Sequence, residues 1–317
     1  MNTTPVNTVD MSTTFGHLEL AAPVTTASGC AAAGRELDQF FDVTQLGAIV
    51  TKSIMLNARS GRPTLRMAET PSGMLNAIGL QGPGIESFIE NDLAWLRDRG
   101  ATTIVSIAGG SIQEYQELAK RLRHEEGIAA LEVNISCPNV ANRGEVFACN
   151  PIEAGGVIHA VRRNTNSRVP ILAKLTPDVT DITQIAKSVI DAGADGISVM
   201  NTTLGVVIDT TTMKPALANV TGGLSGPAIR PMAVRCVWQI HQAYPDVPIL
   251  GMGGIGSGLD ALQFILAGAS AVSVGTTTFN DPTTPFRVQV ELEEALAQRG
   301  FSSLRDAIGF AHPLETD

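Results

Sequence analysis

Four short apolar runs of the sequence end in residues that could bind or polarise a small ligand. Lys52 lies near the end of GAIVTKS, Asn134 lies near the end of AALEVNIS, Lys174 lies near the end of PILAKLT, and Asn201 and Thr202 end GISVMNT. Lysine can stabilise negative charge, and asparagine offers a planar, amide-rich ligand both a donor and an acceptor. A lone lysine in such a place is usually a solvated surface residue, but a converging set favours a binding site.

A cysteine, Cys137, directly follows the run AALEVNIS. An accessible thiolate there could act as a base or a nucleophile, whereas a lone cysteine is more often buried and inert. The residue types alone leave both interpretations open. The other cysteines, Cys30, Cys149 and Cys236, do not have this placement, and the spacing of the four matches no zinc or iron–sulfur pattern. We therefore expect no metal site.

The stretch GMGGIG, residues 251–256, lies between an apolar run and a helical pattern. Its letters fit a dinucleotide-binding fingerprint, but the next run ends in Gly275 and Thr276, where that fingerprint needs an acidic residue. Backbone amides at Gly253, Gly254, Gly275 and Thr276 could instead bind a phosphate in front of helix N-termini. We therefore predict a phosphate site for a mononucleotide. The alternative is that these glycines only make tight turns.

Eight short runs rich in Val and Ile recur along the chain, each followed by a pattern of helical spacing. They lack strict polar alternation, as strands buried on both faces do. Eight such units in 317 residues favour an α/β fold, a (β/α)8 TIM barrel, over a doubly wound sheet. The carboxyl ends of barrel strands meet on one rim, so the polar residues named above would converge. The runs are 23–29, 47–53, 102–108, 129–136, 170–176, 196–202, 248–254 and 271–277.

Three connections are longer than the others, namely 54–101, 137–169 and 203–247. All three leave from the carboxyl ends of predicted strands, which is the face where barrel enzymes build their active sites. We therefore expect insertions at the C-terminal face that form walls of the site. The whole chain, 1–317, is predicted to form a single domain.

Composition argues against two classes of function. The net charge is −9 and no basic run exceeds Arg162-Arg163, so binding to nucleic acid is not expected. No stretch of about 18 apolar residues predicts a membrane span, and the polar first residues do not resemble a secretory signal. We expect a reduced, cytoplasmic protein.

Five motifs, in order, carry a resemblance to a known family: SGMLNAIGLQGPG, EVNISCPNV, GADGISVMNTTLG, LANVTGGLSGPAI and GMGGIGSGLDAL. From about residue 15 to residue 300, the chain resembles the class 1 dihydroorotate dehydrogenases. The resemblance implies a (β/α)8 barrel that binds FMN and oxidises (S)-dihydroorotate to orotate in pyrimidine (UMP) biosynthesis. Cys137 would take the proton from ring carbon 5, and the hydride from ring carbon 6 would pass to flavin nitrogen 5.

The resemblance also implies binding residues at matching positions. Ser106 stands where the family often has Asn, and its shorter hydroxyl leaves its role open. Substrate would contact Lys52, Asn76, Ala77, Ile78, Gly79, Leu80, Asn134, Asn139, Asn201 and Thr202. FMN would contact Ser28, Lys52, Ser53, Asn134, Lys174, Val199, Gly226, Gly253, Gly254, Gly275 and Thr276.

Within the family, EVNISCPNV followed by NRGEVFACNP is more similar to the class 1B, NAD-linked catalytic subunit than to the fumarate-using class 1A. Class 1B implies a partner subunit that carries FAD and a [2Fe–2S] cluster. A homodimer, or a heterotetramer with two such iron–sulfur flavoprotein subunits, is implied on the same ground. Two alternatives are a flavoenzyme like dihydropyrimidine dehydrogenase and a non-catalytic barrel. The presence of both Lys52 and Cys137 argues against the second.

Overall fold

Eight parallel strands form a barrel in the computed structural model of this protein, which describes residues 9–136 and 147–313. The strand order is β3–β16–β15–β10–β9–β8–β7–β4, and a parallel bridge between Thr25 and Ala48 brings the two edge strands together. The predicted barrel is confirmed. Its strands are β3 (Val24–Thr26), β4 (Ile49–Val50), β7 (Thr103–Ile107), β8 (Ala130–Asn134), β9 (Ile171–Lys174), β10 (Gly196–Val199), β15 (Ile249–Met252) and β16 (Ala271–Val274).

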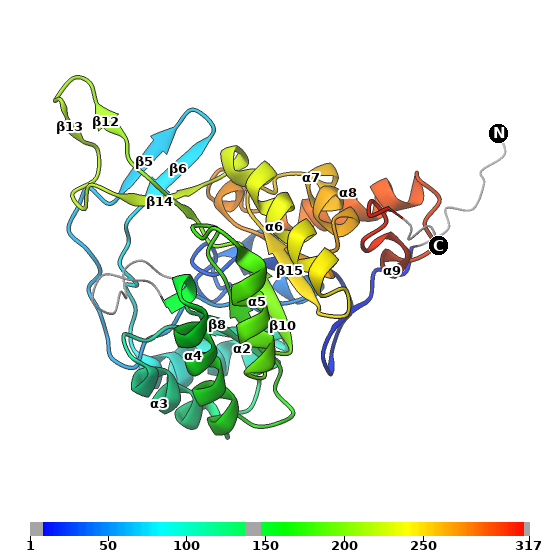
Figure 1. Cartoon of the computed structure of the whole chain (residues 1–317), viewed down its shortest axis with the longest axis horizontal. Helices are drawn as coiled ribbons and strands as arrows, with labels where there is room; N and C mark the ends of the chain where they lie inside the picture. Colours follow the sequence, from blue (N-terminus) through cyan, green and yellow to red (C-terminus); the bar gives the residue numbers. More distant parts are fainter. Residues whose placement is uncertain (1–8, 137–146, 314–317) are drawn as a thin grey trace.

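Helices pack around the barrel, and Figure 1 shows α3 to α8 along its outside. No helix in the described ranges is long and apolar enough to cross a membrane. The helices are α1 (Ile85–Ser87), α2 (Ala94–Arg99), α3 (Ile112–Leu122), α4 (Pro151–Asn164), α5 (Ile182–Asp191), α6 (Arg230–Ala243), α7 (Gly258–Leu266), α8 (Thr284–Ala297) and α9 (Leu304–Ala307). A π-helical turn, η3 (Phe88–Leu93), joins α1 to α2.

The first strand–helix unit departs from the predicted pattern. Two 3₁₀ turns, η1 (Leu37–Gln39) and η2 (Val43–Gln45), follow β3 in place of an α-helix. Gly34 has a φ of +90°, a left-handed conformation that interrupts regular helical geometry. The helix that follows the last barrel strand, α8, packs against β3 instead.

Side-chain caps fix several helix N-termini near the carboxyl ends of the strands. Ser111 accepts a hydrogen bond from Glu114 N at the start of α3. Ser257 does the same for Asp260 N at the start of α7, directly after the GMGGIG turn. Each cap satisfies an amide that the helix itself leaves unpaired. The helix ends that face the rim are therefore held in place.

The barrel interior is apolar at its amino end. Phe15 and Leu20, from the hairpin of β1 (Thr13–Phe15) and β2 (Leu18–Leu20), are buried there. They pack with residues near the strand starts, among them Ala48, Ile104, Ala130, Leu172, Leu250 and Ala271. A second and larger apolar cluster fills the space between the strands and the helices.

Further along the same strands the interior becomes polar. Ser106, Glu132, Lys174 and Ser273 each lie two residues beyond one of these apolar positions, and each is buried. Because side chains alternate across a strand, residues two apart share a face. These polar groups therefore lie inside the barrel, between its apolar end and the rim.

Two of the long connections meet in a four-stranded antiparallel sheet of the order β11–β14–β6–β5. The strands are β5 (Met67–Thr70), β6 (Gly73–Asn76), β11 (Thr203–Gly205) and β14 (Gly222–Ser225). Figure 1 shows β5, β6 and β14 at the end of the molecule away from α9, with the hairpin of β12 (Ile208–Asp209) and β13 (Lys214–Pro215) beyond them. Two of the three predicted insertions are therefore present, and they form a sheet that the sequence pattern did not predict. Residues 137–146 of the third lie outside the described residues. Short 3₁₀ turns complete the chain: η5 (Phe147–Cys149), η6 (Pro227–Ile229) and η7 (Thr276–Phe279).

Candidate functional site

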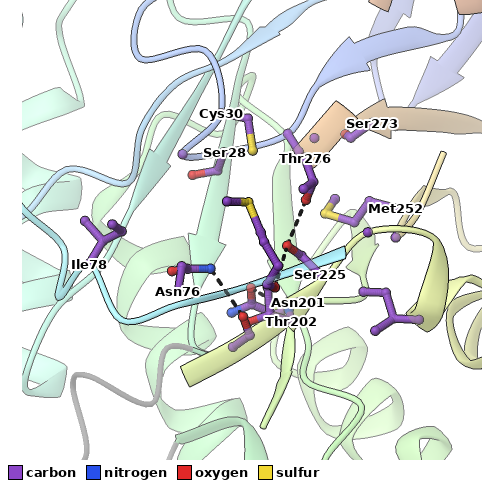
Figure 2. A pocket seen from close by; sticks show the side chains of 18 of the residues that line it. Ser28, Cys30, Asn76, Ile78, Asn201, Thr202, Ser225, Met252, Ser273 and Thr276 are labelled. Atoms are coloured by element: carbon purple, nitrogen blue, oxygen red, sulfur yellow. Dashed lines mark hydrogen bonds between the residues drawn. The ribbon is translucent and has the colours of Figure 1, made fainter. Parts of the chain in front are cut away.

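A cavity of about 380 Å³ lies between the barrel rim and the inserted sheet. This volume is within the range of small-molecule sites. Figure 2 shows Asn76, Asn201 and Thr202 toward one side of the cavity, and Ser28 and Thr276 toward the other. Most residues that the sequence assigns to substrate or FMN line it: Ser28, Lys52, Ser53, Asn76, Ile78, Gly79, Leu80, Asn134, Lys174, Asn201, Thr202, Gly226, Gly253, Gly254, Gly275 and Thr276.

Four of the assigned residues are not among those that line the cavity. Ala77 and Val199 are buried, and each precedes a residue that does line it, Ile78 or Met200. The remaining two, Cys137 and Asn139, lie outside the described residues.

Two asparagine side chains at the rim, those of Asn134 and Asn201, are held by hydrogen bonds to nearby polar groups. Asn134 Nδ2 donates to Ser53 Oγ (3.0 Å), and Asn134 Oδ1 accepts from Ser136 Oγ (3.0 Å). Asn201 Nδ2 donates to Ser136 Oγ (2.9 Å), while Asn201 Oδ1 accepts from Thr202 N (2.9 Å). Fixed donors and acceptors need little reorganisation when a polar ligand binds.

Two lysines bring positive charge to the cavity. Lys174, at the end of β9, is buried, and its Nζ pairs with Glu132 Oε1 at 3.5 Å. Lys52 follows β4, and its Nζ lies 3.8 Å from the place that a Cβ on Gly29 would take. Their charges favour an anionic ligand or a reaction that develops negative charge here.

Two loops at the rim present bare backbone. Gly253 and Gly254 have φ angles of +133° and +75°, and a Cβ at Gly254 would lie 2.7 Å from the carbonyl oxygen of Gly226. Within the described part of the chain, the N–H groups of Gly254, Ile255 and Gly275 have no hydrogen-bond acceptor. Unpaired amides from neighbouring loops form the kind of concave site that binds phosphate.

Several cavity residues were not predicted from the sequence. Met67, Met74, Met200 and Met252 line the cavity and give it adaptable apolar surface, which suits the face of a planar ring. Met200 and Met252 lie in apolar runs, where a methionine looks like a core residue. The sequence therefore gives no signal that they line a cavity. Cys30 also lines the cavity, where burial raises the pKa of its thiol to about 11, partly opposed by the charges of Lys174 and Lys52.

The position of Ser106 answers the question that the sequence left open. Its side chain is fully buried beneath the cavity wall. Ser106 Oγ donates to Glu132 Oε1 (2.9 Å) and lies 3.0 Å from Ser53 Oγ. The short hydroxyl thus supports a residue of the cavity wall from behind.

The comparison with known families decides the identity of this fold and site. The family model described as dihydroorotate dehydrogenase matches residues 10–296. The chain belongs to the dihydroorotate dehydrogenase family. Its relatives include proteins named dihydroorotate dehydrogenase B (NAD(+)), catalytic subunit. It is 47% identical to the one from Geotalea daltonii over 95% of this chain and 97% of that protein. The identity is 48% for Pelobacter propionicus (95% and 98%) and 46% for Desulforamulus reducens (96% and 99%).

Dihydroorotate dehydrogenases are flavin-dependent enzymes, and the chemistry of the cavity in this family member suits a flavin. The bare amides of Gly254 and Gly275 suit a phosphate, and the methionines suit a planar ring. Lys174 supplies positive charge at the barrel interior. The chain thus has counterparts for the phosphate and for the ring of such a cofactor.

Proposed function

We propose that this chain is the catalytic subunit of an NAD-linked dihydroorotate dehydrogenase in pyrimidine biosynthesis. It oxidises (S)-dihydroorotate to orotate and passes the electrons to NAD through a partner subunit. The observation that carries the proposal is the cavity, where two lysines, three asparagines and two glycine loops converge. The names of the relatives, which are catalytic subunits of NAD-linked enzymes, support it.

The cofactor that we propose is FMN, which when bound accepts the hydride from ring carbon 6 of the substrate. Its phosphate would be held by the amides of Gly253, Gly254, Gly275 and Thr276. Lys174 would stabilise negative charge on the reduced ring, because an ammonium held in a buried site is poorly screened by water. The polar groups of Ser28, Ser53 and Asn134, together with Val199 and Gly226, would complete the cofactor contacts.

The substrate is a six-membered ring with amide groups and a carboxylate, and oxidation makes this ring planar. Lys52 would supply the positive charge for the carboxylate, and the backbone of 77–80 would bound the ring. Donors and acceptors for its amide edges would come from Asn76, Asn134, Asn139, Asn201 and Thr202. Cys137 Sγ would take the proton from ring carbon 5. A thiolate performs this task well when its pKa is near the working pH.

The partner subunit that we propose carries FAD and a [2Fe–2S] cluster. The name "catalytic subunit" of the relatives supports the existence of a partner. Within the described residues of this chain, no group of three or more His, Cys, Asp or Glu side chains could hold a metal ion. The assembly that we propose is a homodimer of this chain, with two partner subunits in a heterotetramer.

The test uses purified protein that has been loaded with FMN and made anaerobic. Dihydroorotate should bleach the flavin absorbance, and the reduced protein should be reoxidised by NAD only when the partner subunit is present. Reoxidation by fumarate would assign the chain to the fumarate-using class. Turnover of uracil in place of dihydroorotate would assign it to the pyrimidine-reducing flavoenzymes. A colourless protein that cannot be reconstituted with FMN would contradict the proposed function and both of these alternatives.

A further inference from the structure

A charged carboxylate, Glu132, is fully buried inside the barrel below the cavity. Its Oε1 accepts from Ser106 Oγ (2.9 Å) and pairs with Lys174 Nζ (3.5 Å). Its Oε2 has no hydrogen-bond partner among the described residues. A buried carboxylate is costly unless it is paired and hydrogen-bonded. Its place in the barrel therefore needs an explanation beyond packing.

The pair with Lys174 connects this carboxylate to the cavity. Lys174 lines the cavity, whereas Glu132 does not. An ammonium has three N–H donors, and a contact of 3.5 Å to one carboxylate oxygen leaves donors available on the cavity side. The negative charge also offsets part of the positive charge that Lys174 presents there.

The second connection is a chain of hydroxyl groups. A carboxylate only accepts, so Ser106 must donate to Glu132 and can then accept from Ser53 Oγ at 3.0 Å. Ser53 Oγ in turn accepts from Asn134 Nδ2 at 3.0 Å and from Ser28 Oγ at 3.1 Å. The acceptor at the buried end therefore sets the direction of every hydrogen bond in the chain. Ser28 Oγ is left to accept hydrogen bonds from a ligand in the cavity.

We propose that Glu132 is a positioning residue that sets both the charge and the hydrogen-bond direction at the floor of the cofactor site. It acts through Lys174 on one side and through Ser106 and Ser53 on the other. The inference rests on the proposed binding of FMN. Its main consequence is that Glu132 lowers the reduction potential of the bound cofactor, because it offsets the lysine charge that stabilises the reduced form.

The test is Glu132→Gln in the FMN-loaded protein, which keeps the shape of the side chain and removes its charge. We expect the ratio of the dissociation constants for oxidised and reduced FMN to rise about tenfold, which equals a potential about 30 mV more positive for a two-electron couple. Ser106→Ala is the matched control, since it cuts the hydroxyl chain and leaves the Glu132–Lys174 pair. It should weaken FMN binding and leave that ratio within about twofold of its original value.

Two further variants keep the proposal testable if Glu132→Gln does not fold. Lys174→Gln leaves an unpaired buried carboxylate and should lower the melting temperature, and adding Glu132→Gln should restore it. Because the field of the carboxylate adds to that of the lysine, the second substitution should raise the potential in this background as well. If Glu132→Gln leaves the potential unchanged in both backgrounds, the proposal is wrong. Failure of the unmodified protein to bind FMN would instead contradict the proposed function.

Discussion

Ser225 Oγ and Thr276 Oγ1 lie 2.8 Å apart and connect the inserted sheet to the barrel. Ser225 ends β14, and Thr276 follows β16 in one of the two glycine loops. Both side chains line the cavity, as Figure 2 shows. This hydrogen bond therefore helps to position the sheet relative to the proposed phosphate site.

Ser225→Ala should weaken FMN binding by about two- to tenfold, because it removes one net hydrogen bond and leaves the Thr276 hydroxyl without this partner. The quenching of FMN fluorescence on titration into apoprotein measures the effect. Ser302→Ala is the matched control, since it removes an exposed hydrogen bond to Asp306 next to α9. An FMN affinity that is equal in the two variants would show that the link does not matter for the cofactor.

Gly254→Ala should reduce FMN affinity by at least about tenfold. Residue 254 has a φ of +75°, and the new methyl group would lie 2.7 Å from the carbonyl oxygen of Gly226 and 3.1 Å from Arg230 Cβ. The loop must therefore shift and move its amides, at a cost of about 1–3 kcal/mol. Equilibrium dialysis with FMN measures the loss.

The control for this substitution is Gly100→Ala, at the end of α2. Gly100 has a similar φ of +77°, but a Cβ there would meet nothing within 4 Å. Both variants should have a lower melting temperature, since each places alanine in a left-handed conformation. Only Gly254→Ala should lose FMN. If both lose it equally, the loss reflects general destabilisation.

The barrel could be predicted from the sequence because its strands are local features. Runs such as TTIVSIA and AALEVNIS are largely apolar on both faces, and polar residues follow them at the rim. The inserted sheet could not be predicted in the same way. Its strand β14 has the sequence GGLS, without a β-branched residue, and it pairs with β6 about 150 residues earlier. Such a strand forms because of its partners, and no local periodicity reveals it.

Part of the site could also be predicted, because some of its residues stand out locally in the sequence. Lys52, Asn134 and Asn201 stand out because polar residues are unusual at the ends of buried strands. Glu132 was overlooked, although a single carboxylate inside the apolar run AALEVNIS was a usable signal. Its partnership with Ser106 and Lys174 depends on three strands that are brought together only by the fold. Met74 gave no signal, because its role depends on which face of a hairpin meets the cavity.

Cys30 provides a prediction about pH. Burial raises the pKa of its thiol from 9.0 to about 11, so the folded state binds this proton more tightly than the unfolded state does. The stability linked to Cys30 is therefore fully present below pH 9 and is lost as the pH rises from about 9 to about 11. The rate of Cys30 alkylation, measured by mass spectrometry across a range of pH, should give an apparent pKa near 11 in folded protein and near 9 in urea. Equal profiles in the two states would contradict the assigned burial.

Cys137→Ala should leave FMN bound and slow its reduction by dihydroorotate about 10²- to 10⁴-fold, which is the usual contribution of a positioned base. Anaerobic stopped-flow absorbance measures the rate. In the unmodified protein, the rate should rise with pH through the pKa of the thiol, because only the thiolate takes up a proton. Cys149→Ala is the matched control, since Cys149 is exposed and lies near Asp178. A reduction rate that is unchanged in Cys137→Ala, or a flat pH profile with chemistry rate-limiting, would remove Cys137 from the proposed mechanism.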